Sequence, residues 1–299
     1  MTTLTSTPNE LQKPIHRMVG WIHRLENAAI VFVFGATIVL PLVEAVGRPF
    51  QFSLTGTPEY VRQCVLWLSF LGGLLATRQE RHLRLSTAEF LSEHRGGRFL
   101  RIVAMGVAAA ICLVLAYGSW QVVAVNRETS QLLSIGIPVW VSETIMPVAL
   151  VGIALRFIWF AAPTHSGRLA ACVLSGLGFA LGQGPEFVEA HVWPIAGVIL
   201  VTALLGVPVF AAMAGLGLLF YFADGTPVAA VSAEIYRLIS SPTIPAIPLL
   251  TACGCILAEA KAAERLVDFF KALVGWMPGG IAILVAAVCA VFTTFTGGS

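Results

Sequence analysis

Charged residues are scarce in this sequence, and their scarcity excludes several classes of protein. Asp, Glu, Lys and Arg together make up 11% of the 299 residues, whereas hydrophobic residues make up 57%. Soluble domains are typically about one-quarter charged. The formal net charge of +2 is also too small for nucleic-acid binding, which needs a clustered basic face. A cytosolic dehydrogenase, a secreted disulfide scaffold and a DNA-binding protein are therefore excluded, and the mean hydropathy of +0.85 indicates a membrane protein.

Motifs for catalysis and for metal binding are missing as well. The sequence contains no HExxH, GxSxG or P-loop motif and no GxGxxG that follows a strand. Its six cysteines form no CxxC pair or Cys/His cluster, so we interpret them as small buried hydrophobes. Its six histidines lie at the ends of apolar runs or in loops. We therefore predict that the chain is neither an enzyme nor an ATP-driven pump.

Long apolar runs predict an all-α integral membrane protein, a polytopic helical bundle of about eight spans. A bilayer core of roughly 30 Å requires about 20 apolar residues in a helix. By that rule, spans lie near residues 26–47, 58–77, 99–123, 139–162, 168–183, 193–222, 243–259 and 278–296. The run at 193–222 is too short to cross twice, so we expect one tilted helix, kinked at Pro208 because proline lacks a backbone donor.

The distribution of basic residues predicts the orientation. Segment 78–101 holds six of the eighteen Lys and Arg residues, whereas segment 48–58 holds one and segment 183–193 holds none. Short cytoplasmic loops are enriched in Lys and Arg. We therefore expect a cytoplasmic N-terminus, a cytoplasmic segment 78–101 attracted to anionic lipid, and an external segment 183–193. Counting crossings then places Thr296–Ser299 toward the cytoplasm.

Two further segments are too polar to span the bilayer. Residues 226–241 carry Glu234 and Arg237, and residues 260–275 alternate charged with large apolar side chains. Both patterns are typical of amphipathic helices that lie along the membrane interface. The alternative is a pair of connecting loops with some helix.

Ionisable residues inside or beside the spans are functional candidates, because charge is costly to place in lipid. The residues in question are Glu44, Glu59, Arg62, Glu143 and Arg156. Alternatively, these side chains extend to the interface or pair between helices. The later spans carry no such group at mid-depth, which disfavours a proton relay.

The first half of the chain resembles the small (Q) membrane subunit of tripartite ATP-independent periplasmic (TRAP) transporters. The distinctive element is the W-x-x-F-L-G-x-x-x-A-x-R pattern from Trp67 to Arg78, followed by His82 just past the span. Beyond residue 190 the resemblance moves to the large (M) subunit. It rests there on Leu205–Pro208, Ile244–Leu250 with Gly254, Ala263–Leu266, Pro278–Gly280 and Phe292–Ser299.

The resemblance implies a division of the chain into three parts. Residues 1–163 correspond to the Q scaffold with four spans, 164–192 to a linker with a crossing helix, and 193–299 to the N-terminal part of the M transport subunit. The implied location is the bacterial inner membrane, with multiple passes. The rest of M lies outside this chain, so the M part is incomplete.

The resemblance also implies the function. Members of the family take up organic acids, with C4-dicarboxylates among their substrates. Uptake is a symport driven by sodium, and a periplasmic binding protein delivers the substrate. The implied ion and substrate site is the start of a re-entrant hairpin at Thr296, Gly297, Gly298 and Ser299, whose hydroxyl and carbonyl oxygens suit a small hard cation. A Thr/Gly helix end is also an ordinary C-cap, and the rival function is a non-transporting membrane scaffold, accessory subunit or truncated remnant.

Overall fold

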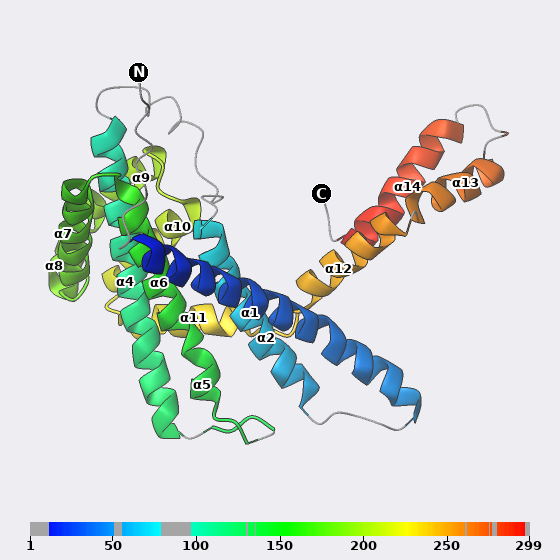
Figure 1. The fold of residues 1–299 in the computed structure, drawn as a ribbon, viewed down its shortest axis with the longest axis horizontal. Helices are drawn as coiled ribbons and strands as arrows, with labels where there is room; N and C mark the ends of the chain where they lie inside the picture. The colour runs from blue at the N-terminus through cyan, green and yellow to red at the C-terminus, as the bar shows by residue number, and fades with distance from the viewer. Residues whose placement is uncertain are drawn as a thin grey trace. The chain divides into compact units, whose positions relative to one another are not determined.

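The computed structural model describes residues 12–50, 56–78, 97–129, 131–134, 136–260, 262–274, 276 and 280–296. Within these ranges the chain is almost entirely helical, and its β-structure is limited to one isolated bridge between Leu132 and Pro138 (Figure 1). The predicted all-α polytopic fold is confirmed. Two compact units form: residues 1–31 with 66–239, and residues 32–65 with 240–299.

The first four predicted spans are confirmed as long apolar helices. Four helices of the described residues are long and apolar enough to cross a membrane, and they extend over Gly20–Phe50, Thr57–Arg78, Gly97–Thr129 and Val139–Ala161. They correspond to α1 (Gln12–Gly47) with the short 3-10 helix η1 (Arg48–Phe50), α2 (Thr57–Arg78), α4 (Gly97–Thr129), and α5 (Val139–Glu143) followed by α6 (Ile145–Ala161).

The remaining helices are shorter. They are α7 (His165–Leu181), α8 (Pro185–Ala190), α9 (Val192–Leu204), α10 (Val209–Ala223), α11 (Val228–Ile239), α12 (Ala246–Glu259), α13 (Ala262–Val274) and α14 (Gly280–Thr296). In the second unit, α14 packs against both α12 and α13.

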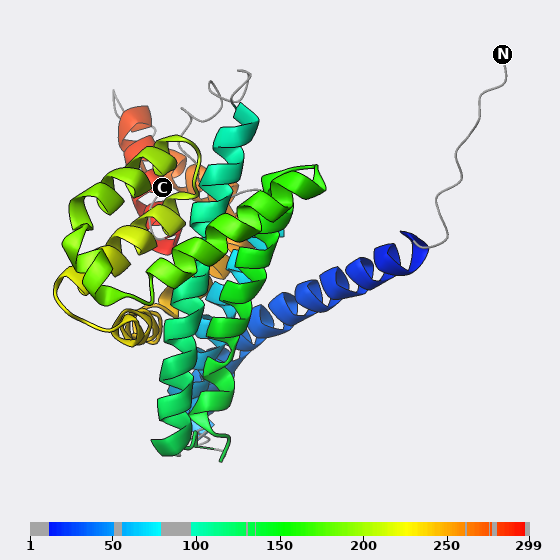
Figure 2. The same ribbon diagram turned by 90° about the vertical axis from the view of Figure 1, so that its left-hand side faces the viewer.

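Helix α4 is the centre of the first unit. It contacts α6, α7 and α11 (Figures 1 and 2). Its buried face is rich in small residues, among them Ala104, Ala108 and Ala109, none of which is more than 1% exposed. Small residues let helix backbones approach closely, and close packing replaces the hydrophobic effect as the main driving force between helices in lipid.

The run at 193–222 is a helical hairpin, and the prediction of one tilted helix is wrong. Residues 199 and 215 would lie about 24 Å apart along a continuous helix. Instead, a Cβ atom added at Gly215 would lie 3.4 Å from the Cδ1 atom of Ile199, so α10 folds back onto α9. Gly206 makes the reversal with a φ of 104°, in the left-handed region that favours glycine.

The hairpin also changes the count of crossings. Helices α9 and α10 contain 13 and 15 residues. Their lengths are therefore about 20 and 22 Å, each less than the thickness of the hydrocarbon core. The cytoplasmic side predicted for Thr296–Ser299 assumed a single crossing at 193–222, so that part of the prediction loses its basis.

Both predicted amphipathic segments are helices. Segment 226–241 contains α11, and segment 260–275 contains α13, so the alternative of connecting loops is wrong for both. Helix α11 lies across α4 rather than along it (Figures 1 and 2). The location of these helices at a membrane interface remains a prediction.

Candidate functional site

The predicted ion and substrate site is at the C-terminal end of α14. Thr296 is the last residue of this helix. Its side chain and the whole of Gly297, Gly298 and Ser299 lie outside what the structure describes. These four residues therefore remain a prediction.

A charged cluster joins α1, α2 and α6 within the first unit. The Glu26 carboxylate accepts from Arg156 Nη2 and, at 3.5 Å, from Arg78 Nη1. Arg156 Nη1 also donates to the Leu74 carbonyl at 2.5 Å, and Arg78 Nη2 donates to Asn27 Oδ1 at 2.8 Å. The side chains of Glu26 and the two arginines are only 14–18% exposed.

The charged cluster explains why Arg156 is tolerated deep in a predicted span. Guanidinium groups donate several hydrogen bonds in a fixed geometry, and here a carboxylate and the Leu74 carbonyl accept them. The interpretation that Arg156 pairs between helices is confirmed. The sequence reasoning missed its partner Glu26. Glu26 stands at the start of the first apolar run, and an isolated acid there, together with arginines in two other spans, was a signal of such an ion pair.

A second polar group joins α4, α5 and α11. Glu143 is fully buried, and Asn126 Nδ2 donates to its two carboxyl oxygens at 2.9 and 2.8 Å. A side-chain hydrogen bond also links Glu143 to Tyr236. Glu143 thus does not extend to the interface, and the sequence reasoning missed both of its partners. We call Asn126, Glu143 and Tyr236 the acceptor cluster, because a single carboxyl group accepts all of these bonds.

The other ionisable candidates make local contacts. Arg48 Nη2 lies 3.2 Å from Glu44 Oε1, one helical turn away, and the Arg48 side chain is 74% exposed. Arg62 Nε donates to the Pro58 carbonyl at 3.2 Å. Exposed pairs of this kind contribute little to stability. Glu59 also has an interaction partner, so none of these residues stands out as a ligand-binding group.

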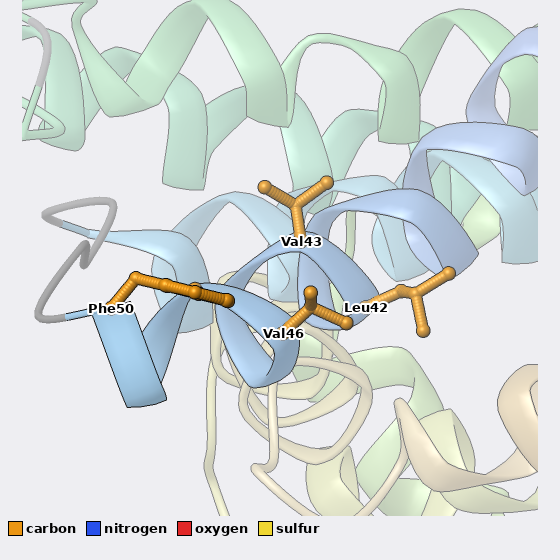
Figure 3. Close-up of a pocket in the computed structure, with 5 residues that line it drawn as sticks. Leu42, Val43, Val46 and Phe50 are labelled. Atoms are coloured by element: carbon orange, nitrogen blue, oxygen red, sulfur yellow. The ribbon is translucent and has the colours of Figure 1, made fainter.

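Two grooves are lined without any charged side chain. A groove of about 480 Å³ follows the end of α1 and is lined by Leu42, Val43, Val46, Gly47 and Phe50 (Figure 3). A smaller cavity of about 260 Å³ is lined by Tyr117 and Gln121 of α4, by Gly182 and Gln183, and by residues of 222–228. Neither offers a cation to an organic anion, and the described residues contain no cluster of His, Cys, Asp and Glu suited to a metal ion.

Comparison with known families matches two stretches of the chain to two components of one transport system. Residues 18–162 match the DctQ component of tripartite ATP-independent periplasmic transporters, and residues 196–299 match the DctM component. The chain belongs to the TRAP transporter family. It is a fused protein with a small-subunit part and a portion of the large-subunit part, and it is a multi-pass membrane protein of a transporter permease family.

Two curated TRAP relatives show the extent of the match. The isethionate TRAP transporter permease protein DctMQ of Oleidesulfovibrio alaskensis is 23% identical over 256 residues, which are 81% of this chain and 39% of that protein. The C4-dicarboxylate TRAP transporter large permease protein DctM of Rhodobacter capsulatus is 28% identical over 106 residues, which are 35% of this chain and 24% of that protein. The chain therefore spans well under half the length of the curated relatives it matches.

Proposed function

We propose that this chain is a membrane component of a sodium-coupled secondary transporter that takes up small organic acids delivered by a periplasmic binding protein. The observation that carries the proposal is the order of the two matches, DctQ over 18–162 and DctM over 196–299, in one chain. The same order in a curated fused DctMQ permease supports it. The bacterial inner membrane, with a cytoplasmic N-terminus, is the proposed location.

The proposed substrate class is the small organic anion. One relative is named for isethionate and the other for C4-dicarboxylates. These compounds share a negative charge but not a carbon skeleton. The two described grooves lack a cationic side chain. We therefore place anion binding elsewhere, beside the end of α14, where backbone and hydroxyl groups of Thr296–Ser299 would bind sodium and substrate.

The test is uptake by cells that express the full-length gene product together with its periplasmic binding protein. We expect uptake of labelled isethionate or succinate in a sodium gradient and little uptake when choline replaces sodium. Thr296→Val removes the hydroxyl of the proposed site while keeping the shape of the side chain. It should reduce sodium-dependent uptake at least tenfold, because an ion loses an oxygen ligand that the solvent cannot replace.

A matched substitution on the same helix provides the control. Thr293 is exposed and lies about one turn before Thr296, so Thr293→Val should leave uptake unchanged. Uptake that continues in choline would contradict sodium coupling. A protein that is well expressed, bound to its partner and inactive with every organic anion would instead support the rival function of a membrane scaffold.

A further inference from the structure

Helix α11 belongs to the DctM-matched part of the chain, but its buried face packs on the DctQ-matched part. Its buried residues are Val228, Val231 and Ser232, which share one face at helical spacing. Glu234 and Arg237 lie on the opposite face and pair with each other at 2.5 Å, with Arg237 71% exposed. The apolar face of α11 is therefore occupied by α4 and not by lipid.

Gly118 of α4 is the point of closest approach. A Cβ atom at this position would lie 2.8 Å from the Val228 carbonyl oxygen and 2.6 Å from the Val228 Cγ1 atom. Real Cβ atoms do not approach a backbone carbonyl this closely, and a helix backbone cannot move aside as a flexible side chain can. Only glycine therefore lets α11 lie this close to α4.

Two polar contacts fix the position of α11 on α4. Ser232 is fully buried, and its hydroxyl donates to the Leu115 carbonyl at 3.2 Å. One turn further along α11, Tyr236 makes a hydrogen bond to the carboxyl group of Glu143, to which Asn126 also donates. Buried hydrogen bonds of this kind specify one arrangement of two helices, because a shifted helix would break the bonds that Ser232 and Tyr236 make to α4 and α5.

We propose that α11 is the main anchor that holds the large-subunit part of this chain on the small-subunit part, beside the smaller contacts that α9 and α10 make with α4. Gly118, the Ser232 contact and the acceptor cluster are the contacts that hold α11 in place. The covalent linker at 164–192 is then not required for the association of the two parts. Tyr236 and Ser232 are positioning residues in this arrangement. The inference uses the two family matches and is independent of the solute and of the coupling ion.

The test separates covalent connection from packing in the full-length protein. A site for a specific protease is inserted in the exposed turn at Gln183, so that α7 stays with the N-terminal fragment after cleavage. An N-terminal affinity tag then captures that fragment in mild detergent. We expect the C-terminal fragment to elute with it. Separation of the two fragments of the unmodified sequence would overturn the proposal.

Two substitutions of different severity locate the anchor. Gly118→Leu should reduce co-elution at least tenfold after cleavage. Gly217→Leu on α10 is its matched control, because nothing lies within 4 Å of a Cβ atom there, and it should leave co-elution unchanged. Equal co-elution of Gly118→Leu and the unmodified protein would show that close packing at Gly118 does not hold the two parts together.

Tyr236→Phe is a milder test of the same contact, for use if Gly118→Leu does not fold. It removes one oxygen atom, and the fragments should then dissociate about fivefold faster, the effect of one lost hydrogen bond. The control is Tyr221→Phe on α10, which should dissociate at the unmodified rate. An unchanged rate for Tyr236→Phe would exclude the acceptor cluster from the anchor. None of these readouts measures uptake, so failure of the anchor and failure of the proposed transport function give different results.

Discussion

The two polar groups of the first unit both hold a carboxyl group inside the helix bundle, but with different partners. In the charged cluster, Glu26 pairs with two arginines, so a half-buried acid is balanced by cations from two other helices. In the acceptor cluster, Glu143 is held by an amide and a phenol. The charged cluster joins helices within the small-subunit part, whereas the acceptor cluster joins that part to α11. Strong ion pairs thus occur where the chain makes a permanent bundle, and hydrogen bonds to uncharged donors occur where its two parts meet.

The largest effect should come from removing the acid of the charged cluster. Glu26→Leu leaves Arg78 and Arg156 without their shared carboxylate, and an uncompensated buried charge costs about 3–5 kcal/mol. We expect a large loss of thermal stability, measured by unfolding of the purified protein in detergent. Glu189→Leu is the matched control because Glu189 is exposed. Similar melting temperatures for the two variants would show that the charged cluster is not a stabilising element.

An intermediate effect is expected in the acceptor cluster. Asn126→Leu removes both amide hydrogen bonds to Glu143 and should cost about 1.5–3 kcal/mol, the range for hydrogen bonds to charged groups. Asn27→Leu is the comparison from the charged cluster. Because Asn27 is exposed and Arg78 keeps Glu26, its substitution should have the smaller effect on the midpoint of chemical unfolding. The reverse order would invalidate the contrast between the two clusters.

The smallest effect belongs to the exposed face of α11. A hydrogen bond from Arg237 lowers the pKa of Glu234 below its ordinary value of 4.5. Any stabilisation from this pair is present above the ordinary carboxyl pKa and is lost as the pH falls through the lowered one. Arg237→Gln should return the pKa of Glu234 toward 4.5, as measured by carboxyl carbon NMR in nanodiscs. Stability at neutral pH should not change, because solvent screens an exposed pair; a clear loss would give Arg237 a role beyond this pair.

The sequence predicted the helices well where length and composition decide the outcome. Uninterrupted apolar runs predict spans with little dependence on neighbours, and the first four of the chain were found. The 193–222 run failed because hydropathy does not distinguish one long helix from two short ones. The position of Gly206 before Pro208 was visible, but only the structure shows that the chain reverses there rather than bends.

The site residues could be predicted only in part, for a different reason. Arg156 and Glu143 stood out because a charge in an apolar run is visible in one dimension. Their partners Glu26 and Asn126 lie 130 and 17 residues away along the chain, and no local pattern connects them. Gly118 had the same limitation, since one glycine in an apolar helix does not indicate which backbone it faces.

The packing of α7 has a consequence for the segment that connects the two family-matched parts. A Cβ atom at Gly178 would lie 2.6 Å from Ala110 Cβ, and one at Gly182 would lie 2.7 Å from Val114 Cγ2. A single inserted residue before Gly178 would turn the rest of the helix by about 100° and place a side chain against α4. The segment that connects the two family-matched parts is therefore constrained in its helical register as well as in its length.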